Sequence, residues 1–245
     1  MRKSNRLILS LLSCAFLSAQ AMAVTAPVSL SFPPNGQFQL TVSNTNPNLI
    51  VIPGDRITGI SSASGKLTDK RNTRDGAVLF SSTGDKPFTL FIETEHGQVI
   101  SVQALPRAGQ GRSYRLLNAE PVARPAAKTW ETSQPYESLL VELNKAILKN
   151  HMPEGYAPAS TEYDRLSAPA GLSMTAEEAW TGNALRVVRY RVTNPFAYAV
   201  ALKEQDFWQT GVRAVMFTPS ALSLLPGTSV TVYITRAQEV SDGQH

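Results

Sequence analysis

Residues 37–42 read QFQLTV, and this stretch gives the clearest indication of the fold. Its apolar members Phe38, Leu40 and Val42 alternate with polar residues. A repeat of two residues is the spacing of a strand that buries one face and exposes the other. The stretch therefore predicts a half-buried β-strand near the start of the chain.

Short apolar runs of the same kind continue on the C-terminal side of this stretch. They occupy residues 49–52, 57–60, 77–80, 88–93, 99–105 and 114–117. Turn-forming residues separate them, as in Pro53-Gly54-Asp55 and in the sequence GDKP at 84–87. Short strands spaced by such turns are typical of an antiparallel sandwich or barrel. We therefore predict an N-terminal β-domain at residues 24–120.

The succession of strands stops at residues 121–127, which read PVARPAA. Two prolines in five residues do not suit a central strand and favour an extended, semi-rigid connector. The sequence therefore predicts a domain boundary or linker at this point.

Helical spacing begins after this connector. The apolar residues that share one helical face are Tyr136, Leu139, Leu140, Leu143 and Ile147. Ser133 is the expected N-cap, and Pro153 with Gly155 marks the expected end. Residues 121–155 are thus predicted to form a Pro-rich linker and one amphipathic helix. A packing brace and a partner-binding helix both remain open as roles for it.

Strand patterns return beyond residues 168–171, which read APAG. The predicted strands occupy residues 185–193, 198–202, 213–217 and 230–235. Together they predict a smaller C-terminal β-sandwich domain at residues 156–245. The fold class predicted for the chain is therefore mainly β, with two β-sandwich-like domains joined by a Pro-rich linker and one amphipathic helix.

The first 23 residues predict a cleaved signal peptide. A basic start precedes an apolar run at residues 7–17, and small residues then end at Ala23. The apolar run is shorter than the roughly 20 residues that a spanning helix needs. An alternative is lipoprotein processing, which would leave a lipidated Cys14. Cleavage after Ala23 is preferred because the apolar run continues past Cys14.

Net charge excludes one class of partner. The chain holds 23 basic and 19 acidic residues, a formal charge of +4. The predicted signal contains three of the basic residues, so 20 basic and 19 acidic residues remain after it, a charge of +1. No basic block is left to neutralise a phosphate backbone, and we expect no direct binding of nucleic acid. The single cysteine also leaves with the signal, so no disulfide is expected.

Catalytic motifs are not evident in the sequence. His96, His151 and His245 are far apart and lack the spacing of metal ligands, so neither a metal nor a cofactor is predicted. Glu93 and Glu95 would lie on one side of a strand, and a hydrolase with a carboxylate pair is a remote alternative. A solvated strand face is the simpler interpretation, so the chain is predicted not to be an enzyme.

Large aromatic side chains suggest a protein that binds other proteins. The candidate interface residues in the C-terminal part are Trp180, Phe207, Trp208 and Phe217. Aromatic residues of this size often dominate the energy of protein interfaces. They also anchor local cores, so this role is a prediction. Edge strands of a β-domain offer a second means of binding, because they can accept a strand from a partner.

Several longer strings point to a family. They lie at residues 48–57 (NLIVIPGDRI), 87–95 (PFTLFIETE), 130–140 (WETSQPYESLL), 180–183 (WTGN), 206–208 (DFW) and 213–217 (RAVMF). In these strings and in their order, the chain resembles the TraK family of F-type conjugative transfer systems. The resemblance covers nearly the whole chain and is weakest at residues 61–76 and 118–128.

The resemblance implies a secretin-like structural subunit of the type IV secretion outer-membrane core complex, needed for pilus assembly and DNA transfer. It implies a periplasmic location, association with the outer membrane through partners, and self-association in a ring. The implied partners are a TraV-like outer-membrane lipoprotein, docked by the C-terminal domain, and a TraB-like envelope-spanning scaffold. A free periplasmic chaperone or binding module that acts by strand addition is the alternative.

Overall fold

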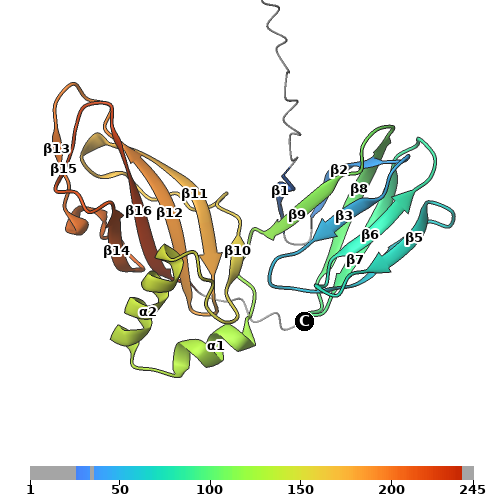
Figure 1. Cartoon of the computed structure of the whole chain (residues 1–245), viewed down its shortest axis with the longest axis horizontal. Coiled ribbons are helices and arrows are strands. Elements are labelled where there is room, and N and C mark those ends of the chain that lie inside the picture. Colours follow the sequence, from blue (N-terminus) through green and yellow to red (C-terminus); the bar gives the residue numbers. More distant parts are fainter. Residues whose placement is uncertain (1–25, 34–35, 239–245) are drawn as a thin grey trace, which may run out of the picture.

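The structure is a computed structural model that describes residues 26–33 and 36–238 (Figure 1). The predicted signal peptide, with Cys14 and Ala23, lies outside the described residues, as does His245. Two β-rich domains lie side by side, and a helical segment follows the first of them (Figure 1). The prediction of a mainly β chain with two β-domains is confirmed.

Nine strands form the N-terminal domain. They are β1 (Val28–Phe32), β2 (Gln37–Ser43), β3 (Asn48–Val51), β4 (Ile57–Ser62), β5 (Leu67–Asn72), β6 (Val78–Ser82), β7 (Phe88–Thr94), β8 (Val99–Arg107) and β9 (Ser113–Asn118). One sheet has the order β1-β9-β3-β6-β5 and the other has the order β2-β8-β7-β4. Residues from both sheets share one hydrophobic core, so the domain is a sandwich.

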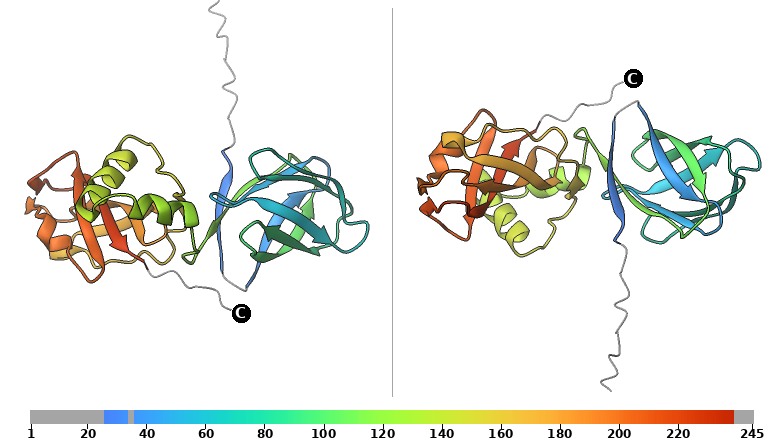
Figure 2. Two further views of the ribbon diagram at one scale, coloured as in Figure 1. Left: turned by 90° about the horizontal axis from the view of Figure 1, so that it is seen from below. Right: turned by 90° about the horizontal axis from the view of Figure 1, so that it is seen from above.

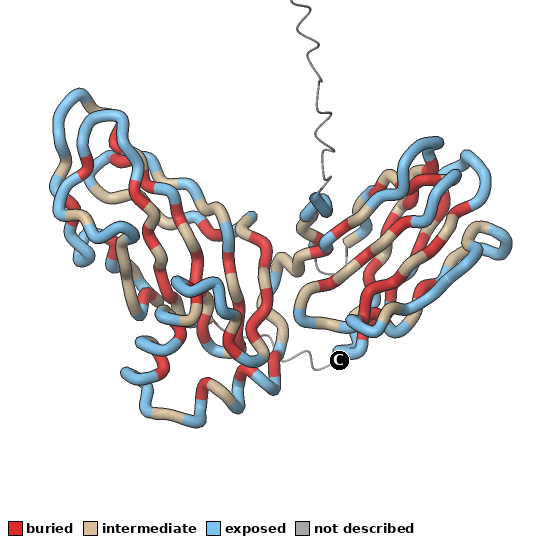
Figure 3. The backbone as a smooth tube through the Cα atoms, viewed as in Figure 1, coloured by how far each residue is buried: buried red, intermediate tan, exposed pale blue. Residues whose placement is uncertain are grey.

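The strand that the sequence indicated most clearly is present as predicted. Leu40 and Val42 of β2 are buried in the core, and Phe38 packs against it. Gln37 and Gln39 are exposed on the other face. Buried positions run along the strands of both domains in this way (Figure 3).

The sandwich is not purely antiparallel, which corrects the prediction. Strand β1 pairs with β9 in parallel, β2 pairs with β8 in parallel, and β3 pairs with β9 in parallel. Strands β1 and β2 are neighbours in the sequence but belong to different sheets. Alternation within a strand reports which face is buried and says nothing about the direction of its partner, so the sequence did not reveal this pairing.

Side chains hydrogen-bond the edges of the four-stranded sheet. At edge strand β4, Asn72 Nδ2 donates to the carbonyl of Ile57 at 2.7 Å. At edge strand β2, Tyr114 Oη donates to the carbonyl of Thr41 at 2.6 Å. Both donors come from the facing sheet. Polar groups that an edge strand would otherwise offer to another chain are thereby occupied.

Asn48 secures the end of β2 in the same way. Its side chain is fully buried, donates to the carbonyl of Ser43 at 2.8 Å, and accepts from the Ser43 amide at 2.7 Å. The same amide oxygen accepts from the Arg112 amide at 3.3 Å. One buried side chain therefore bonds the Ser43 backbone groups at the edge of the sheet, on the strand that pairs with β8.

Two helices follow the N-terminal domain, where one had been predicted. Helix α1 (Pro125–Thr132) occupies part of the expected extended connector, and α2 (Tyr136–Leu148) matches the expected helix. Pro125 is tolerated in the first turn of α1 because no helical bond needs its missing N–H. Ser133 does not cap α2 as predicted: its Oγ donates to the carbonyl of Trp130 at 2.7 Å, at the end of α1.

The C-terminal domain is built on one antiparallel sheet with the order β10-β11-β12-β16-β14. Its strands are β10 (Ala157–Ala159), β11 (Ser173–Thr181), β12 (Leu185–Thr193), β14 (Val212–Thr218) and β16 (Ser229–Ala237). A two-stranded sheet joins β13 (Val200–Ala201) to β15 (Ser223–Leu224). Two short 3-10 helices, η1 (Pro169–Gly171) and η2 (Glu204–Phe207), complete the domain.

This five-stranded sheet has a different cover on each face. Val187 points to one face and packs with residues of α1 and α2. Its neighbour Val188 points to the other face and packs with residues of η2, β13 and β15, among others. The helices therefore belong to the C-terminal domain by their packing, as Figure 2 also shows.

Within the described parts of the chain, no helix is long and apolar enough to cross a membrane.

Candidate functional site

Three of the four predicted interface residues gather around β14. The rings of Phe207 and Phe217 meet edge to face, with 5.5 Å between their centroids. Phe207 is only 1 % exposed and belongs to the core, whereas Trp208 is 51 % exposed. Trp208 lies in the short connection between η2 and β14, so it is the exposed aromatic of this group.

Trp180 lies elsewhere. Its ring stacks on Tyr233 at 6.4 Å, and both pack on the face of the sheet that carries the helices. Phe207 and Phe217 pack on the opposite face. The four side chains therefore do not form one continuous surface in the isolated chain. Contact of any of them with a partner stays a prediction.

Strand β14 ends the C-terminal sheet on the side away from the N-terminal domain (Figure 1). The amide of Ala237 donates to the carbonyl of Gly211, so odd-numbered residues of β16 direct their backbone groups toward β14. The register pairs Val215 with Ile234 and Phe217 with Val232. Backbone groups alternate in direction along an antiparallel strand, so those of Val215 and Phe217 point away from the sheet.

Nothing in the described chain occupies this outer edge. No hydrogen bond from outside the sheet reaches the backbone of residues 213–218 within the described ranges 26–33 and 36–238. The strand has seven residues, and its single charged side chain is Arg213. It thus lacks most of the features that keep an edge strand from pairing with another chain.

An apolar trough runs between β14 and α2. One depression of about 300 Å³ is lined along β14 by Ala214, Val215 and Met216. Its lining from α2 consists of Leu140, Val141, Asn144, Lys145 and Leu148. A second depression of about 630 Å³ follows at the Arg213 end, beneath Tyr136 and Leu139. Together these two depressions are called the α2–β14 trough below.

Helix α2 is held firmly above this trough. Leu139, Leu143 and Ile147 are buried against the sheet. Asn144 Oδ1 also accepts a hydrogen bond from Thr235 Oγ1 at 3.2 Å. Val141 and Leu148, which line the trough, lie on the side of the helix away from these buried anchors and are exposed. Buried anchors and exposed apolar neighbours on one helix give the trough a rigid wall.

The rim of the trough is basic. Lys128 and Arg213 line the larger depression together with the buried Glu131, and Lys145 lines the smaller one. Lys145 lies 2.9 Å from Glu142 on the same helix. No ion pair is found for Lys128 or Arg213 among the residues that the structure describes. Positive charge beside an apolar surface favours a ligand that carries carboxylates.

A buried carboxylate fixes α1 to the sheet beside the trough. Glu131 accepts hydrogen bonds from Tyr156 Oη at 2.8 Å, from the Asn183 amide at 3.0 Å and from the Ala184 amide at 2.8 Å. Burial raises the pKa of Tyr156 far above its usual value, and the negative charge of Glu131 raises it further. Tyr156 is therefore a neutral donor at ordinary pH.

This anchor explains two of the longer sequence strings. Residues 180–183 span the end of β11 and the start of its turn into β12, and Gly182 in this turn lies against Glu131. A Cβ on Gly182 would stand 2.3 Å from a Glu131 oxygen and 2.4 Å from the Tyr156 ring. The sequence analysis noted both strings but missed their contact, because residues 131 and 182 are distant in sequence.

The joint between the domains depends on Arg124. Its Nη1 donates to the carbonyl of Gly54 in the N-terminal domain at 3.2 Å, and its amide donates to Asn183 Oδ1 at 3.3 Å. Burial lowers the pKa of the guanidinium, and the nearby Asp55 carboxylate partly opposes that shift. One residue thus links both domains to the β11–β12 turn.

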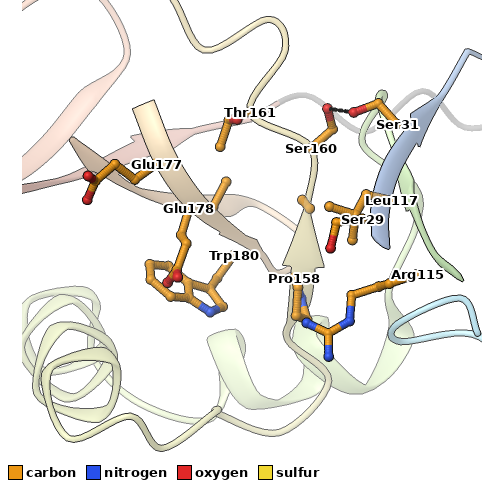
Figure 4. Close-up of a pocket in the computed structure, with 12 residues that line it drawn as sticks. Ser29, Ser31, Arg115, Leu117, Pro158, Ser160, Thr161, Glu177, Glu178 and Trp180 are labelled. Atoms are coloured by element: carbon orange, nitrogen blue, oxygen red, sulfur yellow. Dashed lines mark hydrogen bonds between the residues drawn. The ribbon is translucent and has the colours of Figure 1, made fainter. Parts of the chain in front are cut away.

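A pocket of about 470 Å³ lies beside this joint, between β1 and β9 on one side and β10 and β11 on the other (Figure 4). Ser31 and Ser160 share a hydrogen bond across its mouth. Glu177 pairs with Arg191 at 2.5 Å, and Glu178 pairs with Arg189 at 3.0 Å. Its carboxylates are therefore neutralised by arginines of β12 and form no free acid–base pair.

The residues considered for catalysis lie apart from this pocket. Glu93 is exposed, and the exposed Glu95 lies 3.6 Å from Arg56 Nε. His96 Nδ1 lies 2.8 Å from Asp55 Oδ1, while His151 is exposed just after α2. Within residues 26–33 and 36–238, no three His, Cys, Asp or Glu side chains come together as a metal-binding group.

Comparison with known proteins gives a consistent result over both domains. A family model described as TraK N-terminal domain matches residues 31–126, and one described as TraK C-terminal domain matches residues 127–236. The TraK lipoprotein of Escherichia coli strain K12 is 41 % identical over 242 residues, which covers 98 % of this chain and 99 % of that relative.

Proposed function

This chain belongs to the TraK family of bacterial conjugation proteins, and on that premise we propose that it is a structural subunit of the outer-membrane core complex of a type IV secretion system. In this role it supports pilus assembly and DNA transfer by holding other subunits in place. Its action is geometric and involves no chemical step. A TraV-like lipoprotein docks to the C-terminal domain, and a TraB-like scaffold connects the complex to the inner membrane.

The two-domain architecture supports this role. Each domain has its own hydrophobic core, and few hydrogen bonds join them, chiefly through Arg124 and Ser160. One copy therefore presents two separate surfaces to other subunits. Head-to-tail contacts between such copies close into a ring when the rotation between neighbours permits it.

The observation that carries the proposal is the open β14 edge beside the α2–β14 trough. A chain that works alone gains nothing from a strand edge with a single charged residue and an exposed apolar trough, and both increase the risk of aggregation. A subunit that meets its partner soon after export gains a docking surface from them. The trough is therefore the surface to which we assign the lipoprotein.

The envelope location rests on two observations about the family and the N-terminus. The Escherichia coli relative is called a lipoprotein, and residues 1–23 of this chain have the pattern of an export signal. Cleavage after Ala23 would leave no cysteine, whereas processing at Cys14 would attach lipid to this chain itself. Mass spectrometry of the mature protein separates the two, because we expect an unmodified N-terminus at Val24.

Purification from cells that carry the whole transfer system tests the function. The expected result is a very large particle that contains the lipoprotein and many copies of this chain. The alternative is a free periplasmic chaperone, which would also use an open strand edge. One-to-one complexes with pilin-like proteins, and no large particle, would contradict the proposal and support the chaperone.

A further inference from the structure

We propose that β14 accepts an extended, acidic segment of the partner as an added strand, and that alternate side chains of this segment enter the α2–β14 trough. The identity of the partner as the lipoprotein rests on the proposed function. The acceptor strand, the conformation of the bound segment and its charge are inferred here from the contacts of the C-terminal domain.

The backbone of β14 determines the conformation of the ligand. Val215 and Phe217 direct N–H and C=O groups away from the sheet, and these groups have no hydrogen-bond partner among residues 26–33 and 36–238. An extended chain placed 4.7–4.9 Å away, the usual spacing of neighbouring strands, would satisfy these groups. Main-chain bonds of this kind supply affinity, and pockets beside the strand supply specificity for alternate side chains.

The trough determines which side chains fit. Ala214 and Met216 face α2, so an added strand would place every second side chain on that side, between Met216 and the exposed Val141. The two depressions of about 300 and 630 Å³ leave room for branched or aromatic residues there. Apolar residues at alternate positions are therefore expected in the bound segment.

The rim determines the charge of the segment. Lys128 and Arg213 lie at one end of the trough, and neither has an acidic partner in the described chain. Acidic residues at the corresponding end of the segment would complement them and would make binding sensitive to salt.

Other strand edges of this chain explain why the ligand is a different protein. Side chains hydrogen-bond the edges of β2 and β4, and β5 carries Asp69, Lys70 and Arg71. Edge strand β10 has Pro158 at its centre, and β1 borders the C-terminal domain (Figure 2). Apart from its own β14, a second copy thus offers no comparable open strand within the described residues.

The test measures binding of the purified chain to the lipoprotein of the same transfer system, in a soluble form without its lipid-bearing cysteine. Val141→Glu places a charge in the trough, and Arg213→Glu reverses the rim. We expect each variant to weaken binding by roughly tenfold or more, a change of about 1.4 kcal/mol. Val215→Pro removes an outward N–H, which an edge strand tolerates, and it also changes a side chain that packs against the core; it should weaken binding as well.

Matched controls are available in the N-terminal domain. Val99 is 65 % exposed, so Val99→Glu repeats the substitution made at Val141, which is 51 % exposed. Arg74→Glu, at an exposed turn, repeats the charge reversal. Both controls should bind like the unaltered chain. Circular dichroism and urea unfolding check the fold of each variant, and if Val215→Pro fails to fold, the two surface variants still decide the outcome.

Three results would overturn the inference. If Val141→Glu and Arg213→Glu bind the lipoprotein like the unaltered chain, the partner docks elsewhere and the proposed function stands. If these variants change only the self-association of the chain, a second copy occupies the trough. If the unaltered chain does not bind the lipoprotein at all, the proposed function fails, and the partner named here fails with it.

Discussion

The two domains differ in how their edge strands are protected from pairing with other chains. In the N-terminal sandwich, side chains from the facing sheet hydrogen-bond the edges of β2 and β4, and charged residues line β5. In the C-terminal domain, no other described part of the chain bonds the outer backbone edge of β14, and an apolar trough lies beside it. Closed edges keep a β-domain from pairing with other chains, and this contrast is why we propose the open edge as the place where a partner pairs.

The cores differ as well. The N-terminal domain buries two sheets against each other and needs no helix. The C-terminal sheet has one face covered by α1 and α2, and this cover also forms one wall of the trough. In the C-terminal domain, the helices that cover the core therefore also shape the trough, whereas the core of the N-terminal domain depends on no such helices.

The largest expected effect is on the free energy of unfolding, and it should come from a substitution in α2 that disturbs both the core and the trough. Leu143 in α2 and Leu90 in β7 are both fully buried. Replacing either leucine by alanine should lower the free energy of unfolding of its own domain by about 3 kcal/mol. Only Leu143→Ala should also weaken binding of the lipoprotein, because only α2 forms a wall of the trough.

Tryptophan fluorescence can assign each loss to a domain. All three tryptophans, Trp130, Trp180 and Trp208, lie outside the N-terminal β-domain. In urea, Leu143→Ala should shift the fluorescence transition, while Leu90→Ala should shift mainly the transition seen by circular dichroism. Equal loss of lipoprotein binding in both variants would show that the coupling is not specific to the C-terminal domain.

A smaller loss of unfolding free energy is expected when Asn48, which hydrogen-bonds the edge strand β2, is replaced. Asn48→Ala removes the buried amide that bonds both backbone groups of Ser43. The Ser43 amide is then left unpaired, while the Ser43 carbonyl keeps the hydrogen bond that Ser82 Oγ donates at 3.0 Å. This loss should cost about 2 kcal/mol of unfolding free energy. It should also expose the end of β2 and promote self-association, which light scattering would detect. A variant that is destabilised but stays monomeric would argue that Asn48 serves stability alone.

The smallest expected change in the free energy of unfolding comes from alkaline pH, and it should affect the C-terminal domain. Burial raises the pKa of Tyr156 above the usual value of 10.0. Above pH 10 the unfolded chain loses this proton while the folded chain keeps it, so stability falls as pH rises. The slope is at most about 1.4 kcal/mol per pH unit for one group.

Tyr156→Phe should reduce this slope in tryptophan-monitored unfolding curves. Tyr163→Phe is the matched control, because Tyr163 is 66 % exposed. It should leave the slope unchanged. An identical alkaline slope in the unaltered chain and in Tyr156→Phe would exclude Tyr156 as its source.

The sequence was sufficient to predict those elements whose residue pattern is local. Alternation at residues 37–42 identified a true strand, and helical spacing identified α2 with Leu139, Leu143 and Ile147 buried. It failed for α1, because the prolines of the segment suggested an extended connector whereas Pro125 begins a helix.

The candidate site was only partly predictable. Sequence analysis selected Trp208 and Phe217 near β14, but it could not show that β14 is an edge. That position depends on pairing with β16, which comes later in the chain. Trp180 and Phe207 were grouped by residue type, although Trp180 of β11 packs on the face that carries the helices and Phe207 of η2 packs on the opposite face.

Amide hydrogen exchange along β14 tests the central claim most directly. In the free chain, the outward amides of Val215 and Phe217 should exchange quickly, while those of Ala214 and Met216, which bond to β16, should exchange slowly. Addition of the lipoprotein should slow Val215 and Phe217 specifically. Slow exchange at Val215 and Phe217 without any partner, or rates that a bound lipoprotein leaves unchanged, would contradict the account.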